Sequence, residues 1–365
     1  MATVVTGWGK CLPPAVLTND DLADFMDTSD AWIRPRTGIA ERRVSHVGMT
    51  ELAYVAAARA MAAAGLEPAD CDAVIVATAS PDLLIPNTAS RVQHKLGNTA
   101  AAAFDINVGC CGFIYGLTVA NGLISTGVHE RILVIGAERL TPILDWTIRD
   151  SAILFGDGAG AVVLERADQS NGQTGVLGAY LACNPVPGEA LMATDLGTPP
   201  SPPGPRKPFN LQFDGREVFR HAVPGMVNAS LRALERAGLS VDDVDLLVPH
   251  QANLRIVEAV GKKLPFDAAK VVTNLQRYGN TSAASIPIAL CEAIEEGRVD
   301  PGAILLVAAF GAGLTSAAAV IGWGPRVTPK AVAAAELPEC SETARQLIDP
   351  ALDFQRAWHA ERESG

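Results

Sequence analysis

Short apolar runs of strand length alternate with longer segments of helical periodicity along most of the chain. RILVIGAE at residues 131–138 and ILLVAAFG at residues 304–311 are almost continuously apolar. Such runs indicate strands that are buried on both faces. Their alternation with helical segments predicts mixed sheets covered by helices in layers, so the fold class is α/β.

Two segments of the chain repeat one another. RAMAAAGLEPADCDAVIVA at residues 59–77 corresponds to RALERAGLSVDDVDLLVPH at residues 232–250, with Arg, Ala, Gly, Leu and Asp at equivalent places. Each copy is typical of a helix that ends at a glycine, Gly65 or Gly238, followed by a short turn and an apolar strand. We therefore interpret the chain as two copies of one α/β unit, which should pack face to face.

The repeat predicts how the chain is divided. We expect an N-terminal half at residues 1–170, a linker at 171–215, a C-terminal half at 216–324 and a tail at 325–365. Within the linker, residues 185–208 contain eight of the 24 prolines. Because proline removes a backbone donor, this Pro-rich segment is predicted to be an excursion loop. The tail loses the strand pattern and is predicted to be a polar helical extension.

Composition and charge narrow the class of protein. With 365 residues, 48% hydrophobic and 19% charged, the chain can bury one large core or two fused ones. A net charge of -11 and a pI near 5.1 disfavour general electrostatic binding to nucleic acid or to anionic lipid. Seven cysteines without a CxxC pair, and a start without the layout of an export signal, favour a reducing cytoplasm.

Two uncharged stretches, residues 106–128 and 302–324, are long enough to imitate membrane spans. The first contains several glycines, and the second is interrupted by Gly311 and Gly313. These breaks favour buried elements joined at turns, so we expect no insertion into a membrane.

One cysteine lies where a strand meets a helix. FDINVGCCGFIYG places Cys110 between a predicted strand, Phe104 to Val108, and a helix that begins near Phe113. A helix N-terminus would lower the pKa of such a thiol, and its amides could hold an oxyanion. The alternative is a small buried hydrophobe. Cys111 competes for the same role on this segment alone, and a metal site is disfavoured because a second ligand pair is missing.

Two polar residues follow predicted elements of the second copy. His250 comes directly after a predicted strand at Asp245 to Val248, the kind of strand end where α/β proteins place chemistry. Asn280 precedes a run of small residues that is typical of a helix start, with Thr281 and Ser282 available as caps. Taken singly, each residue also has a structural interpretation: His250 as a hydrogen-bonded imidazole of the core, and Asn280 as an asparagine of a turn.

Together these motifs are family-specific. DINVGCCGF, VPHQANLRI, RYGNTSAASIP and AAFGAGLT, with TSDAWIRPRTGIAERR and LFGDGAGAVVL, occur in an order that resembles the β-ketoacyl-acyl carrier protein synthase III branch of the thiolase-like proteins. The resemblance implies a five-layered α-β-α-β-α fold built from an internal duplication. It also implies that the nucleophile is Cys110, five residues after Asp105, and that His250 and Asn280 are its catalytic partners.

The activity that the resemblance implies is a decarboxylating condensation. An acyl-CoA would acylate Cys110, and malonyl-acyl carrier protein or malonyl-CoA would then give a 3-oxoacyl thioester that starts fatty acid or related biosynthesis. His250 and Asn280 would hold the enolate; the amide can only donate near neutral pH, whereas the imidazole can also handle protons. The oxyanion loop would be Gly311, Ala312 and Gly313, in which Ala312 departs from the three glycines usual in the family.

Further contacts are carried over from the family motifs. Coenzyme A would be held by a set of aromatic, basic and small residues: Thr28, Trp32, Arg36, Arg149, Phe219, Ala252 and Asn253. Carrier protein would dock on four basic residues: Arg220, Arg255, Lys262 and Lys263. Ile85 would close the acyl pocket of the second subunit of a homodimer, and Asp150 replaces the glycine that commonly follows Arg149. The coenzyme A thioester would be a substrate, with no permanently bound cofactor and no metal.

Other functions are distinguished by particular residues. LFGDGAGAVVL contains GxGxG, but a phosphate cradle needs a helix start and a β-rich run follows, so we expect a strand–turn–strand shaped by Asp157. A thiolase would need a second cysteine in AAFGAGLT, and Cys291 falls in a predicted core helix. An acyltransferase of secondary metabolism, forming an ester or amide or condensing a non-standard acyl group, stays open, although Asn280 favours decarboxylation. The complete triad argues against a non-catalytic partner subunit.

Overall fold

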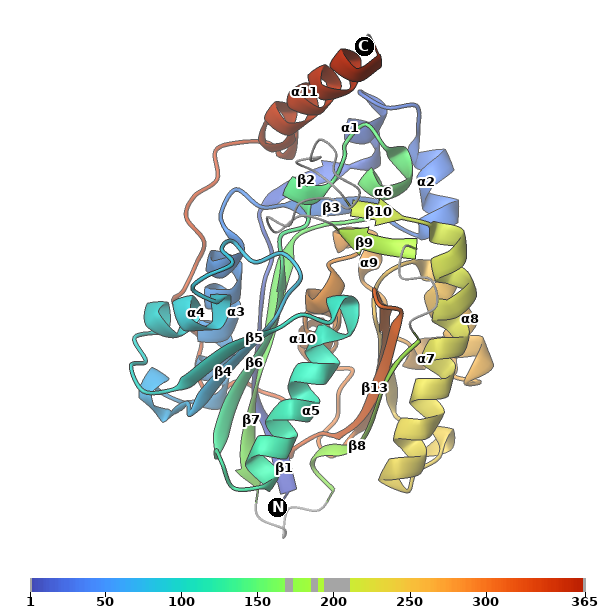
Figure 1. Cartoon of the computed structure of the whole chain (residues 1–365). Helices are drawn as coiled ribbons and strands as arrows, with labels where there is room; N and C mark the ends of the chain where they lie inside the picture. Colours follow the sequence, from blue (N-terminus) through green and yellow to red (C-terminus); the bar gives the residue numbers. More distant parts are fainter. Residues whose placement is uncertain (1, 168–172, 185–189, 194–210, 364–365) are drawn as a thin grey trace.

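Two sheets form the centre of the molecule (Figure 1). The computed structural model describes residues 2–167, 173–184, 190–193 and 211–363. The first sheet has the strand order β1-β7-β6-β4-β5 and the second has the order β11-β12-β13-β8. The strands of the first sheet are β1 (Ala2–Cys11), β4 (Ala73–Ala77), β5 (Ala102–Ile106), β6 (Arg131–Glu138) and β7 (Gly158–Ala167). Those of the second are β8 (Gly175–Cys183), β11 (Leu246–Pro249), β12 (Ile304–Gly311) and β13 (Thr315–Gly322).

The strand pairing repeats between the two sheets. β4 pairs parallel with β6, which pairs antiparallel with β7, and β7 pairs antiparallel with β1. β11, β12, β13 and β8 follow the same sequence of pairings. This agreement confirms the duplication that the sequence predicts, and β6 and β12 have the predicted bounds. β5 is the one strand of the first sheet that has no equivalent in the second sheet of the described chain.

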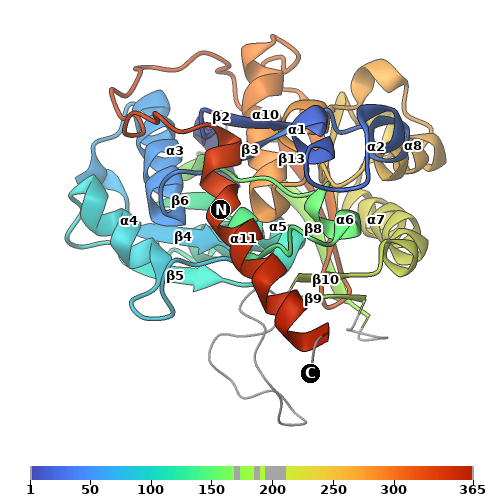
Figure 2. The ribbon, with the colours of Figure 1, turned by 90° about the horizontal axis from the view of Figure 1, so that it is seen from above.

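Helices cover both sheets and separate them, in the layer order that the family resemblance implies (Figure 2). The outer face of the first sheet is covered by α3 (Met49–Ala64) and α4 (Thr88–Leu96). The outer face of the second is covered by α7 (Gly215–Ala237) and α8 (Leu254–Lys263). Between the sheets lie α5 (Gly112–Ser125) and α10 (Ser285–Glu295).

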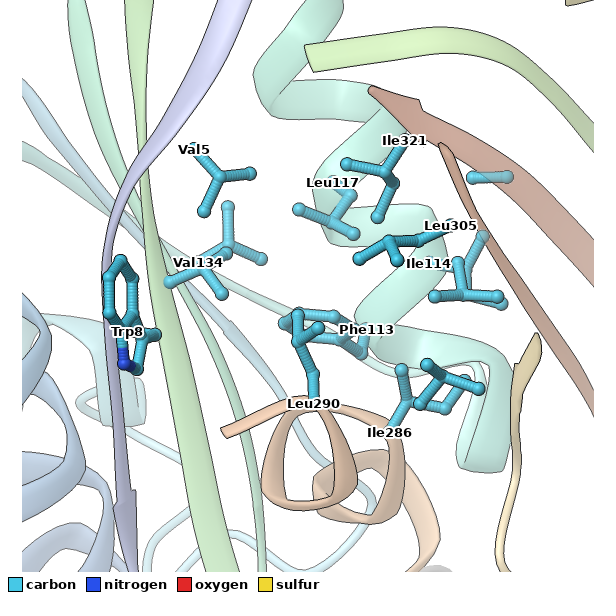
Figure 3. Packing of buried hydrophobic residues seen from close by; sticks show 14 of the residues in the cluster. Val5, Trp8, Phe113, Ile114, Leu117, Val134, Ile286, Leu290, Leu305 and Ile321 are labelled. Carbon is cyan, nitrogen blue, oxygen red and sulfur yellow. The ribbon is translucent and has the colours of Figure 1, made fainter. Parts of the chain in front are cut away.

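The middle layer is apolar because α5 is enclosed by both halves of the chain (Figure 3). Phe113, Ile114 and Leu117 on α5 lie between Val134 of the first sheet and Leu305 of the second. All five side chains are at most 1% exposed. A helix that is hydrophobic all round must be buried, which explains why this segment looks like a membrane span in the sequence alone. Among the described residues, no helix is long and apolar enough to cross a membrane.

Two equivalent glycines end the outer helices α3 and α7. Gly65 and Gly238 each have a φ of 69° and a left-handed conformation, and their N–H groups close the last helical turn. Glycine adopts this conformation without the cost that a Cβ atom brings. The predicted helix ends are therefore confirmed in both copies.

Shorter elements gather at one end of the sheets (Figure 1). They are β2 (Ala15–Thr18), α1 (Asn19–Ala23), α2 (Asp30–Thr37), β3 (Glu41–Val44), α6 (Arg149–Ala152), β9 (Leu191–Ala193), β10 (Leu211–Phe213) and α9 (Leu275–Tyr278). The tail adds α11 (Ala344–Glu363) at the same end. These elements surround the ends of the strands from which the candidate residues extend.

Several predicted boundaries shift in the structure. β5 begins and ends two residues before the predicted strand, and β11 begins and ends one residue after its prediction. β8 lies within the predicted linker, yet it pairs with β13 of the second sheet. Most of the Pro-rich segment, residues 185–189 and 194–208, lies outside the described residues.

The strand–turn–strand prediction for residues 154–164 is half correct. The turn is followed by the strand β7, as predicted, but it is preceded by the helix α6 and not by a strand.

Candidate active site

The candidate residues of both halves line one cavity of about 550 Å³. Cys110, His250, Asn280 and Gly311 all contribute to its wall. They come from four different segments: the turn before α5, the end of β11, the segment before α10, and the end of β12. The duplication therefore brings together side chains that are far apart in the sequence.

The two adjacent cysteines face opposite ways. Cys110 lies in the tight turn Gly109–Cys111 between β5 and α5, is 7% exposed and lines the cavity. Cys111 is fully buried in the middle layer, where its thiol lies 3.6 Å from the carbonyl oxygen of Thr315. Burial raises the pKa of the Cys111 thiol far above its usual range. Of the two, only Cys110 has access to a ligand in this cavity.

The expected lowering of the Cys110 pKa is wrong. Burial raises the pKa of its thiol to about 11, and the negative charge of Glu138 contributes in the same direction. A hydrogen bond with the Ser282 side chain and the backbone of the turn oppose this shift without reversing it. The loss of hydration on burial is the largest contribution to the Cys110 pKa and outweighs these hydrogen bonds. Cys110 is thus a thiol at neutral pH, and its attack on a thioester requires removal of a proton.

A neutral imidazole lies in the same cavity. His250 directly follows β11, and its backbone N–H donates to Ala308 on β12. Burial lowers the pKa of His250 to about 4, so the ring is uncharged at neutral pH. An uncharged imidazole can accept one proton and donate another, which suits both a proton transfer and a hydrogen bond to an oxyanion.

Ser285 orients this ring, and sequence reasoning missed it. Its hydroxyl lies 2.6 Å from His250 Nδ1 and also accepts a hydrogen bond from the backbone N–H of Gln251. The direction of the bond to Nδ1 depends on the tautomer of the ring; when the hydroxyl donates to Nδ1, the ring proton is on Nε2. The repeat could have identified the place of this residue. Ser285 is equivalent to Gly112 of the first copy, and these two residues begin the equivalent helices α10 and α5.

The Asn280 amide is held by the backbone. Its Oδ1 accepts from the N–H of Ser282 at 2.8 Å, which leaves the amino group as the part of the side chain that can donate to a ligand. Ser282 has a φ of 47°, a left-handed conformation that is uncommon for a residue with a Cβ atom. Thr281 occupies the cap position of the short turn Ser282–Ala284 that precedes α10, but without a side-chain hydrogen bond. The cap prediction is wrong for Ser282, which donates to Glu138, and the cap position of α10 itself is Ala284.

Glu138, which sequence reasoning also missed, anchors this strained segment. It is fully buried at the end of β6 and accepts from Ser282 at 3.0 Å. It also accepts from the side chains of Thr78 and Ser80 and from the Ala79 N–H. Burial raises the pKa of this carboxyl, and the hydrogen bonds oppose that rise. An acidic residue that directly follows the apolar run of residues 132–137 is the signal that could have identified it.

The glycine loop packs against the nucleophile. A Cβ atom added at Gly311 would lie 2.9 Å from the backbone nitrogen of Cys110, so only glycine allows this approach. Gly313 has a φ of 125°, whereas Ala312 does not have a positive φ. The alanine therefore fits because the unusual conformation falls on its neighbour. Of the three loop residues, Gly311 lines the cavity.

Several of the side chains predicted to bind coenzyme A contact one another. The guanidinium carbons of Arg36 and Arg149 are 4.4 and 4.1 Å from the centre of the Trp32 ring. Asn253 donates to the backbone oxygen of Arg36 at 3.1 Å. Four of the predicted coenzyme contacts line the cavity: Arg36, Phe219, Ala252 and Asn253. Thr28, Trp32 and Arg149 are outside that lining, and Asp150 is part of it.

The predicted docking residues lie on the two helices beside the cavity. Arg220 is on α7, and Arg255, Lys262 and Lys263 are on α8, all with exposed side chains. Arg220 pairs with Glu217 at 3.4 Å, and the Arg255 guanidinium lies over the ring of Phe219.

Ile85, the residue predicted to close an acyl pocket, is 83% exposed and does not line the cavity of its own chain. Over the described residues, no cluster of three His, Cys, Asp or Glu side chains could hold a metal ion.

Comparisons with known proteins agree with this geometry. A family profile described as 3-oxoacyl-[acyl-carrier-protein (ACP)] synthase III matches residues 104–185, and the profile of the C-terminal part of that family matches residues 234–323. The β-ketoacyl-[acyl-carrier-protein] synthase III 2 of Vibrio vulnificus (strain YJ016) is 49% identical over 354 residues, 97% of each chain. The β-ketoacyl-[acyl-carrier-protein] synthase III of Caldanaerobacter subterraneus is 47% identical over 328 residues, 88% of this chain and 98% of the relative.

A solved structure has the same fold. The crystal structure of 3-oxoacyl-[acyl-carrier-protein] synthase III from Aquifex aeolicus VF5 superposes with a TM-score of 0.82 at 42% identity. The match covers 88% of this chain and 100% of that one. Part of the present chain therefore has no counterpart in that structure.

Proposed function

The chain belongs to the β-ketoacyl-acyl carrier protein synthase III family, and we propose that it catalyses the family's condensation through Cys110, His250 and Asn280. It is an acyltransferase that would join an acyl-CoA to malonyl-acyl carrier protein. The observation that carries this assignment is the shared cavity wall, to which both halves contribute these three side chains.

In the first half-reaction, the Cys110 sulfur attacks the thioester carbon of the acyl-CoA. A carbon–sulfur bond forms to Cys110, the bond to coenzyme A breaks, and the thiol proton passes to the leaving thiolate. The raised pKa of Cys110 makes this proton transfer necessary, and the neutral His250 in the same cavity is the group that can relay it. Backbone N–H groups of Cys110 and the glycine loop would receive the developing oxyanion.

In the second half-reaction, the malonyl thioester loses carbon dioxide and leaves an enolate. Its carbon attacks the acyl group on Cys110, which releases the 3-oxoacyl thioester and returns the sulfur to the thiol after uptake of one proton. The enolate oxygen requires donors that are already in place, because donors that reorganise during the reaction stabilise it less. The Asn280 amino group and the His250 Nε2–H, each held by a hydrogen bond to a serine, fit this requirement.

The coenzyme and carrier surfaces are part of the same proposal. Trp32 and Arg149 would bind the adenine end of coenzyme A, because both groups stack on flat rings; the Arg149 guanidinium lies 4.1 Å from the centre of the Trp32 ring and would move away from it to admit the base. Carrier protein is acidic and so is this chain, so docking needs a local basic patch. The four exposed basic residues of α7 and α8 meet that need.

A homodimer is supported by the edge of the first sheet. All residues of β5 are at least partly exposed, and Leu83, Leu84 and Ile85 form an exposed apolar loop nearby in the sequence. An unpaired strand edge beside exposed apolar side chains favours association with a second copy. We propose that Ile85 then reaches the acyl pocket of the partner, as the family resemblance implies.

The test of the proposed function is a reconstituted condensation. Purified protein is mixed with a panel of acyl-CoAs and malonyl-acyl carrier protein labelled at the free carboxyl carbon. We expect release of labelled carbon dioxide that depends on the acyl-CoA, together with a 3-oxoacyl-carrier protein. Transfer of the acyl group to an alcohol or amine without release of carbon dioxide would contradict the proposal and favour the secondary-metabolism alternative.

A further inference from the structure

The tail helix α11 lies across the end of the molecule where the shorter elements gather (Figures 1 and 2), and one of its faces packs against them. Its residues Ala344, Ile348 and Leu352 are at most 2% exposed and join a cluster with Leu144 and Trp146. The prediction of a polar extension is thus incomplete, because one face of the helix is apolar and covered. Both family profiles end before this helix, at residues 185 and 323.

A buried amide on α11 binds the backbone of one particular segment. Gln355 is 1% exposed, its Nε2 donates to the Leu144 oxygen at 2.8 Å, and its Oε1 accepts from the Trp146 N–H at 2.7 Å. His359, one helical turn later, lies 2.9 Å from the carboxylate of Asp145. The same carboxylate accepts from the backbone and side chain of Thr147. The helix therefore holds residues 144–147 in one conformation.

This segment leads directly to Arg149. The Arg149 guanidinium stacks on Trp32 and donates to the backbone oxygen of Asp27 at 2.9 Å. The helix α11 also contacts the segment that contains Asp27. Arg356 donates to the backbone oxygen of Phe25 at 3.4 Å, and the Arg345 guanidinium lies 4.2 Å from the centre of the Phe25 ring. The helix α11 thus contacts both the segment that leads to Arg149 and Phe25, two residues before the Asp27 oxygen that accepts from Arg149.

We propose that Gln355 is a positioning residue for binding of the nucleotide end of coenzyme A, acting through the segment that carries Arg149. The inference rests on the proposed function, because it assumes that Arg149 and Trp32 receive the adenine. A buried amide that satisfies two backbone groups is costly to lose, since both groups would then be enclosed without partners or the segment would move. Movement of the segment would lower the fraction of molecules in which Arg149 faces Trp32, and binding weakens in proportion to that fraction.

The experiment compares two substrates that differ only in the nucleotide. KM and kcat are measured for the acyl-CoA that the wild-type protein uses best and for the matching S-acylpantetheine, which has no nucleotide. Gln355→Met keeps the side-chain volume and removes both hydrogen bonds, and His359→Ala removes the more exposed contact to Asp145. Asp353→Ala, an exposed position on the same helix, is the matched control.

We expect Gln355→Met to raise KM for the acyl-CoA roughly tenfold, the change produced when the competent arrangement falls to about a tenth of the molecules. His359→Ala should raise it to a smaller extent, and Asp353→Ala should leave it unchanged. KM for S-acylpantetheine and kcat for both substrates should stay at wild-type values, which a general loss of structure would not allow. Hydrogen exchange should be faster in Gln355→Met at residues 144–149.

Two outcomes would overturn the inference. One is an unchanged KM for acyl-CoA in both variants while they remain folded, and the other is an equal rise of KM for both thioesters. If Gln355→Met fails to fold, the acyl-CoA and pantetheine comparison in His359→Ala decides alone. If the wild-type protein accepts neither thioester, the proposed function is wrong and the inference fails with it. That outcome is distinguishable from a failure of the inference alone, because it is seen in the wild type before any substitution is made.

Discussion

The two halves of the chain share one strand order but carry different chemistry at equivalent positions. At the offset that places Arg59 on Arg232, Ala77 at the end of β4 corresponds to His250 after β11. Glu138 at the end of β6 corresponds to Gly311 at the end of β12. The repeat thus determines where strands end, while the residue at each end determines what the site can do. The first half supplies the thiol and a buried anchor, and the second supplies the hydrogen-bond donors.

The sharpest difference between the halves is the proposed enolate-binding pair, His250 and Asn280, and removing one of its donors should have the largest effect. We expect Asn280→Ala to reduce carbon dioxide release from malonyl-carrier protein by roughly 10² to 10³, the usual loss when one oxyanion donor is removed. Acylation of Cys110 should be retained, because the proposed acylation step uses Cys110, His250 and backbone N–H groups and not the Asn280 amide. The measurement is labelled carbon dioxide release beside the mass of the acyl-enzyme.

A matched control is available within the first half. Asn121 lies on α5 and accepts from Thr3 rather than facing the cavity. Asn121→Ala should therefore leave condensation at the wild-type rate. Unchanged decarboxylation in Asn280→Ala would contradict the proposed role of this residue, because it would show that the Asn280 amide does not stabilise the enolate.

The buried imidazole of the second half should make stability depend on acid, which its equivalent Ala77 cannot do. The pKa of His250 is lowered to about 4 in the folded protein, whereas an unfolded chain takes up the proton near 6.5. The contribution of His250 to stability is therefore present above pH 6.5 and is lost as the pH falls from 6.5 to 4. We expect a loss of about 3 kcal/mol over that range.

This loss can be separated from the other titrating groups by substitution. His250→Asn removes the titration, so its free energy of unfolding should fall by about 3 kcal/mol less than that of the wild type between pH 7 and pH 4. Urea unfolding at fixed protein concentration gives both values. Identical pH dependence in the two proteins would show that the imidazole is not buried and neutral.

The halves also differ at the edges of their sheets. The outer edge of β11 is occupied, because Val272 donates to the Leu247 oxygen at 2.9 Å, whereas β5 lies at an edge with partly exposed residues. If this edge and the adjoining apolar loop form a homodimer, Leu84→Asp should weaken association by about 2 kcal/mol or more, roughly thirtyfold in the dissociation constant. Sedimentation equilibrium measures this constant.

The control for the edge prediction is another exposed apolar residue. Val332 is 87% exposed and lies in the segment that leads to α11, so Val332→Asp should leave the dissociation constant unchanged. Equal weakening by both substitutions would mean that the effect arises from added charge and not from the edge of the first sheet.

A smaller effect is expected at Ser285, the counterpart of Gly112. Ser285→Ala removes the hydroxyl that is 2.6 Å from His250 Nδ1 and should lower the condensation rate about tenfold, the value of one hydrogen bond to a buried group. Ser285→Thr, which keeps a hydroxyl, should recover part of the rate. The comparison of single-turnover rates tests this, and a wild-type rate in Ser285→Ala would exclude a role in orienting the ring.

Much of this arrangement is predictable from the sequence because it depends on local patterns. The duplication, the helix ends at Gly65 and Gly238, and the bounds of β6 and β12 all follow from hydrophobic periodicity and glycine chemistry. Cys110, His250 and Asn280 were expected from motifs, and all three line one cavity, whereas Thr28, Trp32 and Arg149 lie outside that lining.

The remainder depends on packing between distant segments. The sequence places Cys110 at a helix N-terminus, but not inside an enclosed cavity, and enclosure reverses the expected direction of its pKa shift. The partnership of Glu138 with Ser282 and that of Gln355 with residues 144–146 join segments that are far apart in the chain. Such pairs become visible only when the layers are assembled.

The central claim is that Cys110, and not its neighbour Cys111, receives the acyl group in the cavity shared with His250 and Asn280. The direct measurement is the intact mass of the wild type, Cys110→Ala and Cys111→Ala after mixing with acyl-CoA. We expect an added acyl group on the wild type and on Cys111→Ala, and none on Cys110→Ala. Loss of the added mass in Cys111→Ala alone, with acylation retained in Cys110→Ala, would contradict it.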